Sequence, residues 1–365
     1  MGDLKMTGLA GIVAAETRLS MVDGENGRLI YQGYLAKDLA LNYSFEEVAY
    51  LLLYGKLPSK TELHGFQCKL AENRHLPAYL IRILNELPED MEVMSVLRTA
   101  ISSLGRSEFG WKPNIDQAIR LIAITPVIVA YRYRQQHNLP IIKPSDNLNH
   151  TANYLYMLTG EVPKDVHIRA LTVYMILTME HGMNASTFAA RVVTSTHSDL
   201  ASAIVGAIGA MKGPLHGGAP TEVIQLLDEI GSLENAELYI RGKLERGELL
   251  MGFGHRVYKT TDPRAEALRS ITSELIGEDA WLDLAYHVEK TAIQLLDEFK
   301  PGRRLYTNVE FYAAAVLKAV EMPAELFTPT FTVSRTVGWT AHVIEQADNN
   351  KIFRPQSEYV GEIPS

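Results

Sequence analysis

Residues 44–62, SFEEVAYLLLYGKLPSKTE, predict two consecutive helices and so favour a mainly helical fold. Ser44 is followed by Glu47, and Ser59 by Glu62, which is the spacing of the capping boxes that begin helices. A glycine lies between the two segments, where the first helix is expected to end. We therefore expect a helical hairpin here.

The same helical signal continues through most of the chain. Apolar residues recur at helical spacing near 166–177, 200–211 and 285–299, whereas strand-like alternation is confined to residues 11–34, around the turn sequence DGENG. The apolar run 121–130, LIAITPVIVA, reads as a buried core helix and is too short to span a bilayer. The sequence predicts a mainly α protein with a small N-terminal β-hairpin, and argues against a parallel-sheet nucleotide fold.

Length and composition restrict the remaining classes. A chain of 365 residues exceeds the ~250–300 residues of a single core, so we expect a large helical domain, 1–212 with 322–365, and a small helical domain, 213–321. The formal charge of −8 argues against binding to nucleic acid or to an anionic membrane. The single cysteine, Cys68, cannot form an internal disulfide, which fits a reducing cytoplasm.

Three histidines stand in unusual settings, each with an ordinary alternative explanation. His216, in GPLHGGAPTEV, precedes a predicted helix whose N-terminus favours a neutral ring, although a loop histidine can simply cap backbone groups. His255 lies in the cationic loop MGFGHRVYKTTDPR with Lys259 and Arg264, which suits an anionic substrate but equally a solvated surface. His181, in MEHGMNAST, follows an apolar helix and could serve its C-terminus.

One carboxylate and two further arginines complete the candidate residues. Glu310, in YTNVEFYAAAV, follows the predicted N-cap Asn308, where acidic residues commonly stabilise a helix. Arg335, in FTVSRTVGW, and Arg354, in FRPQSEYVG, lie in apolar stretches and need either an internal carboxylate or an anionic ligand. The sequence contains no HExxH motif, cysteine and histidine cluster or P-loop, so a metal or nucleotide-phosphate enzyme has little support.

Taken together, these motifs resemble the citrate synthase family, in their order and over nearly the whole chain, and the N-terminal part resembles the short bacterial and archaeal members. The resemblance implies a homodimer that condenses acetyl-CoA with oxaloacetate and water to citrate and CoA, a step of the tricarboxylic acid cycle. It implies no metal and no resident cofactor, with coenzyme A arriving as the substrate thioester.

The resemblance also implies a role for each candidate. His216, His255 and Glu310 would be catalytic: His216 would bind the thioester oxygen, His255 would protonate the oxaloacetate ketone, and Glu310 would remove the acyl proton. The residues that would hold oxaloacetate are His181, Arg264, Arg335 and, from the partner subunit, Arg354; Lys259 would contact CoA.

The sequence departs from the family pattern at one position, since the usual catalytic base is aspartate and this chain has Glu310. Two alternatives stay open. One is a 2-methylcitrate synthase that uses propionyl-CoA, because an extra methyl group changes discrimination by only ~1–3 kcal/mol. The other is a non-catalytic helical dimer that binds a ligand.

Overall fold

The computed structural model describes residues 8–9, 11–217, 219–254, 258, 260–273, 280–303 and 305–363. It is mainly helical, as predicted, with one small antiparallel sheet. The strands are β1 (Ser20–Asp23), β2 (Arg28–Tyr31) and β3 (Tyr34–Leu35), paired in the order β1-β2-β3 with Ser20 opposite Tyr31. No helix among the described residues is long and apolar enough to cross a membrane.

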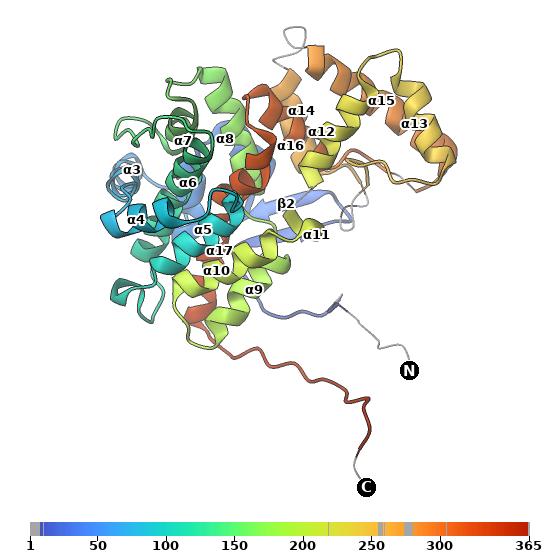
Figure 1. Ribbon diagram of the computed structural model, residues 1–365. Helices are drawn as coiled ribbons and strands as arrows, with labels where there is room; N and C mark the ends of the chain where they lie inside the picture. The colour runs from blue at the N-terminus through green and yellow to red at the C-terminus, as the bar shows by residue number, and fades with distance from the viewer. Residues whose placement is uncertain are drawn as a thin grey trace.

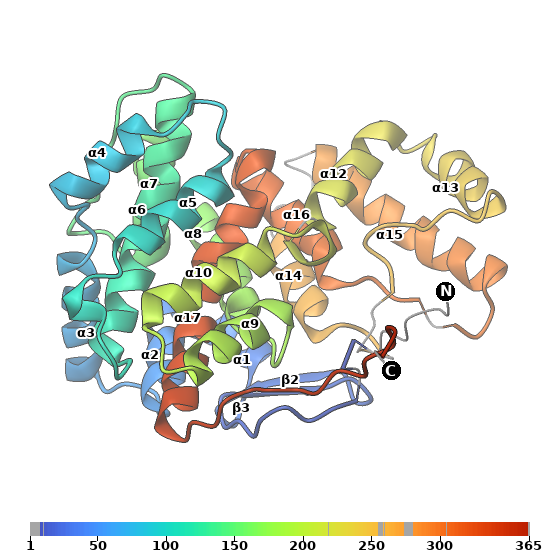
Figure 2. The same cartoon turned by 60° about the horizontal axis from the view of Figure 1, so that its bottom comes forward.

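The helices between residues 36 and 211 and the last helix pack together as one body (Figures 1 and 2). They are α1 (Ala36–Asn42), α2 (Phe45–Tyr54), α3 (Lys60–Glu72), α4 (Ala78–Glu86), α5 (Val93–Ser103), α6 (Ile115–Gln136), α7 (His150–Thr159), α8 (Asp165–Met179), α9 (Ala185–Ser195), α10 (Leu200–Met211) and α17 (Phe327–Asp348), with short 3-10 helices at Ser107–Phe109 and Ala324–Leu326.

A second group of helices lies to one side of this body in both views (Figures 1 and 2). It contains α12 (Ala219–Ile230), α13 (Ala236–Glu245), α14 (Pro263–Ser273), α15 (Ala280–Phe299) and α16 (Val309–Ala319), and the short α11 (Pro214–Gly217) leads into it. Helices α14 and α16 also pack against α8. The division at residues 213–321 stays a prediction.

The local sequence signals that predicted where helices begin and end are present in the structure. Both capping boxes, Ser44 with Glu47 and Ser59 with Glu62, are present, and Gly55 ends α2 in the left-handed conformation with a φ of 77°. The run 121–130 lies inside α6 and is buried, Pro126 included. Local sequence therefore decides where these helices begin and end.

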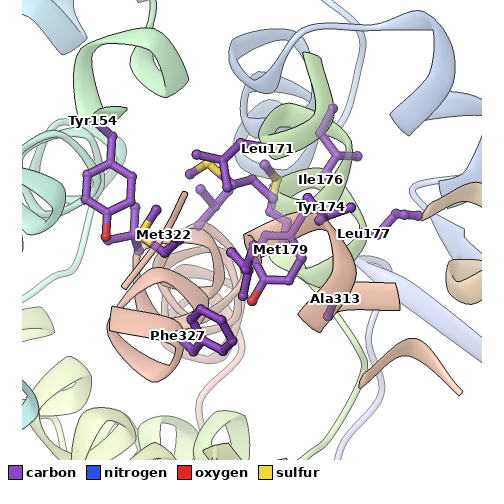
Figure 3. Packing of buried hydrophobic residues seen from close by; sticks show 14 of the residues in the cluster. Tyr154, Leu171, Tyr174, Ile176, Leu177, Met179, Ala313, Met322 and Phe327 are labelled. Atoms are coloured by element: carbon purple, nitrogen blue, oxygen red, sulfur yellow. The ribbon is translucent and has the colours of Figure 1, made fainter. Parts of the chain in front are cut away.

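Helices α8 and α17 form the centre of the core. Residues 170–179 of α8 are all buried, and Figure 3 shows Leu171, Tyr174 and Met179 of α8 in the same cluster of buried side chains as Phe327 of α17. Gly338 of α17 has no room for a side chain, because a Cβ atom there would lie 2.4 Å from the Met179 carbonyl oxygen and 2.5 Å from Glu180 Oε2. The end of α8 is thus pressed directly against the α17 backbone.

Candidate active site

His216 lies in α11 and is held by residues from two distant helices. Its Nε2 lies 2.7 Å from the Ser186 hydroxyl of α9, and that oxygen also accepts a hydrogen bond of 3.0 Å from Trp339 Nε1 of α17. The Ser186 hydroxyl is also 2.8 Å from Asn184 Oδ1. The imidazole orientation is therefore set by a buried polar group, not by solvent.

The environment of His216 favours the neutral ring, as the sequence predicted. Burial, and secondarily the positive charge of Arg335, lowers the pKa of His216 to about 4. His216 lies in the short α11, directly before α12, so its position ahead of a helix is as predicted. At neutral pH the ring is uncharged and can donate one hydrogen bond.

Glu310 is the second residue of α16 and is partly buried. Its backbone N–H donates to Asn308 Oδ1 at 3.0 Å, which confirms Asn308 as the N-cap. Burial raises the pKa of Glu310 to about 7, while Arg264 and Arg335 lower it and Asp262 raises it. A carboxyl group with a pKa near neutrality is suited to accept a proton in catalysis.

Arg335 lies near both His216 and Glu310. Its side chain is only 2% exposed, Nε donates to the Thr178 carbonyl oxygen at 2.7 Å, and the guanidinium lies over the Phe331 ring at 4.7 Å. Within the described part of the chain, no carboxylate forms an ion pair with it. A buried guanidinium in this state is suited to an anionic ligand.

Arg264 is also buried, and Asp262 holds it. Nε and Nη2 of Arg264 donate to the two oxygens of Asp262 at 3.0 and 2.9 Å. The guanidinium also lies 5.6 Å from the centre of the Tyr258 ring. Burial lowers the pKa of Arg335, and the positive charge of Arg264 lowers it further, so the two arginines face the same interior region.

His181 follows α8, and Tyr258 contacts both His181 and Arg264. Its Nε2 lies 3.1 Å from the Tyr258 hydroxyl. The chain before it is fixed by Tyr31 of β2, whose hydroxyl donates to the Glu180 carbonyl oxygen at 2.8 Å, and by Glu180 Oε1, which accepts from Gly182 N at 2.6 Å. The small sheet therefore anchors the segment that carries His181.

Not every predicted residue joins this group. Arg354 lies on the exposed C-terminal segment and lines a separate cavity of about 1060 Å³ between residues 9–18 and 345–355, which contains none of the other candidates. His255 and Lys259 lie outside the described residues. The group that the structure brings together is His181, His216, Arg264, Glu310 and Arg335.

Sequence reasoning missed the residues that hold the candidates in position. Ser186 and Tyr258 carry no signal of their own, because they act on residues 30 and 77 positions away. Asp262 did carry one: an acid directly before Pro263 marks a helix start, and it precedes Arg264 by two residues.

Comparisons with known proteins cover nearly the whole chain. The family model described as "Citrate synthase, C-terminal domain" matches residues 8–356. The 2-methylcitrate synthase of Shewanella oneidensis is 42% identical over 98% of this chain and 95% of its own length, and the citrate synthase of Synechocystis sp. is 39% identical over 97% and 90%.

A solved structure extends the agreement to three dimensions. The citrate synthase of Thermoplasma acidophilum, in a ternary complex with carboxymethyl coenzyme A and oxaloacetate, is 31% identical, covers 98% of this chain and 96% of its own, and has a TM-score of 0.90. A family model and relatives over nearly the full length carry the assignment. The chain belongs to the citrate synthase family, whose members are enzymes that condense an acyl-CoA with oxaloacetate.

Proposed function

We propose that this chain condenses acetyl-CoA with oxaloacetate and water, giving citrate and free CoA. One observation carries the proposal: a carboxyl group with a pKa of about 7, Glu310, and a neutral imidazole, His216, both face the buried guanidinium of Arg335. These groups are a base, a hydrogen-bond donor for a developing oxyanion, and an anchor for a carboxylate.

The proposed reaction begins with proton removal. Glu310 takes a proton from the acyl methyl group, and His216 donates a hydrogen bond to the thioester oxygen as negative charge develops there. A thioester α-proton is much less acidic than a carboxylic acid, so stabilisation of that oxygen must supply most of the driving force. The contact of 2.7 Å between His216 Nε2 and the Ser186 hydroxyl fixes the orientation of the ring for this role.

The later steps use the oxaloacetate site. The new carbon nucleophile attacks the ketone carbon, and the ketone oxygen gains a proton, a role that the family resemblance gives to His255. Water then hydrolyses the thioester and releases CoA. Arg264, Arg335 and His181 hold the oxaloacetate carboxylates, and Lys259 contacts CoA.

The deciding experiment is a CoA-release assay with acetyl-CoA and with propionyl-CoA, each with oxaloacetate, and with the product identified by mass spectrometry. We expect faster release with acetyl-CoA and citrate as the product. Preference for propionyl-CoA would instead identify a 2-methylcitrate synthase, an alternative that stays open because relatives of both names have similar identities to this chain. No release with either thioester, and no deuterium exchange at the acyl methyl group, would contradict enzymatic function altogether.

Arg335→Lys is expected to raise the KM for oxaloacetate by about ten- to 100-fold. Lysine cannot form the two parallel hydrogen bonds that a guanidinium gives a carboxylate, and it lacks the Nε that donates to Thr178. Saturation kinetics and thermal melting of the purified variant measure the effect and the fold. Arg241→Lys, on the surface of α13, is the matched control, and an unchanged oxaloacetate KM in Arg335→Lys would contradict the assignment.

The pH dependence follows from the two shifted groups. Since Glu310 must be ionised to act as a base, kcat/KM is expected to fall on the acid side through a pH of about 7. His216, with a pKa of about 4, stays neutral over this range and adds no second loss of activity. An acid limb centred near the usual glutamate value would show that Glu310 is not the group that titrates.

We also propose a homodimer in which Arg354 reaches the site of the partner subunit. Support comes from the C-terminal segment, where Tyr359, Val360 and Ile363 are 72%, 68% and 82% exposed, which is unusual for apolar side chains in one short stretch. Gel filtration is expected to give a mass near two subunits, and a monomer would contradict a shared site.

The cytoplasmic location inferred from Cys68 stays a prediction.

A further inference from the structure

Asp262 is a buried carboxylate whose two oxygens connect both parts of the site. The residue is 1% exposed. Oδ1 accepts from Arg264 N and Nε, each at 3.0 Å, while Oδ2 accepts from Arg264 Nη2 at 2.9 Å and from Val309 N at 3.1 Å. One side chain thus bridges the start of α14 and the start of α16, which lie 47 residues apart along the chain.

The contact with Arg264 determines how that guanidinium is aimed. The carboxylate engages Nε and Nη2 as a fork, and two parallel charge-assisted hydrogen bonds fix the plane of the group. An arginine has five N–H donors, and this fork uses two of them on one side. The planar group is therefore oriented before any ligand arrives.

The contact with Val309 determines where α16 begins. Val309 is the first residue of the helix, and the next residue is Glu310. The N–H of Val309 is held by Asp262 and that of Glu310 by Asn308, whose own N–H and Nδ2 donate at 2.9 Å to the carbonyl oxygens of Gly252 and Gly254. The first turn of α16 is thereby fixed to the loop before α14.

We propose that Asp262 is a positioning residue for the condensation, which aims Arg264 at an oxaloacetate carboxylate and Glu310 at the acyl methyl group through one rigid bridge. The proposal rests on the proposed function. It assigns no contact between Asp262 and either substrate. Asp262 would then set the relative positions of the two substrates without contacting either of them.

The charges around Glu310 give the bridge a second effect. The charged and titratable groups that face Glu310 in the described residues are Asp262 and Arg264 from the start of α14, Arg335 from α17 and Tyr174 from α8. Asp262 opposes the influence of the nearby arginines on the pKa of Glu310. Loss of its charge therefore favours ionised Glu310 and makes it a weaker base.

Asp262→Asn tests both effects in the full-length protein. We expect kcat to fall about 100-fold, because a misplacement of about 1 Å has that effect on a positioned group. We also expect oxaloacetate to bind at least tenfold more weakly in titration calorimetry. The acid limb of kcat/KM should move to lower pH by about one unit, because a negative charge near Glu310 has been removed.

Val309→Pro separates the helix contact from the arginine contact. Proline is favoured at the first position of a helix, and it lacks the N–H that donates to Asp262, so the change removes that hydrogen bond and keeps the fork on Arg264. We expect kcat to fall about tenfold, with oxaloacetate affinity within about twofold of wild type and an unmoved acid limb. Wild-type kcat in this variant would overturn the helix half of the proposal.

Glu289→Gln is the matched control. Glu289 is a buried carboxylate that holds the same helix by accepting from Thr307 Oγ1 at 2.8 Å and from the Tyr312 hydroxyl, and it is not among the groups that shift Glu310. We expect a lower melting temperature with unchanged oxaloacetate affinity and acid limb. The same kinetic pattern as Asp262→Asn would mean that Asp262 merely stabilises the fold and would overturn the proposal.

The binding measurement keeps this inference separate from the proposed function. If wild type binds oxaloacetate but releases no CoA, the proposed function fails, whereas the affinity ratio of Asp262→Asn to wild type still decides the arginine half. If wild type releases CoA and Asp262→Asn keeps wild-type affinity, kcat and acid limb, the positioning role is excluded and the function stands.

Discussion

Replacing Glu310 with glutamine is expected to lower kcat by between about 100-fold and 10,000-fold, the range that a positioned general base contributes. Glutamine keeps the length and shape of the side chain but cannot accept the acyl proton. The backbone N–H of residue 310 still donates to Asn308, so the start of α16 should be preserved. The measurement is CoA release at saturating substrates, together with deuterium exchange at the acyl methyl group.

Glu310→Asp is the matched variant for this prediction. It retains the carboxylate and is one methylene shorter, which is the length that the family pattern has at this position. We expect it to retain far more activity than the glutamine variant, because the chemistry survives and only the geometry changes. A glutamine variant with activity within tenfold of wild type would show that this carboxyl group is not the base.

His216→Ala is expected to lower kcat by about 100- to 1,000-fold, which corresponds to the ~2.7–4 kcal/mol of a single oxyanion donor. Burial keeps the ring neutral for this role, and the contact with Ser186 fixes the orientation of the ring. The loss should appear in kcat, with little change in oxaloacetate affinity, because the donor acts on the thioester.

His64→Ala controls for the general effect of removing a histidine. His64 is exposed on α3, far along the chain from every candidate residue, and its loss should leave turnover unchanged. Thermal melting should show both variants folded. Comparable turnover in His216→Ala and in wild type would contradict the oxyanion role.

The features that the sequence predicted are those set by neighbours in the chain. The capping boxes at Ser44 and Ser59, the glycine that ends α2 and the buried run in α6 depend on residues within a few positions, so their patterns are legible without a structure. For Arg335 the sequence predicted an apolar setting and a need for either an internal carboxylate or an anionic ligand. The residue is buried, and no carboxylate among the described residues forms an ion pair with it.

The features that it did not predict depend on tertiary contacts. Trp339 and Ser186 are 153 residues apart, and only the packing of α17 on α9 joins them behind His216. The hydrogen bond between Asp262 and Val309 joins two motifs, and neither motif alone predicts it. The role proposed for Arg354 depends on a second chain, so a single sequence gives no pattern from which its neighbours could be deduced.

The contact at Gly338 has a consequence for attempts to redesign the acyl preference. Because the backbone of α17 there touches the segment that leads into His181, any larger residue would push apart the elements that carry Arg335 and His181, the proposed oxaloacetate ligands. A mutant library that randomises α17 should hold this codon constant, since diversity at that one position would fill the screen with inactive clones and obscure useful changes elsewhere on the helix.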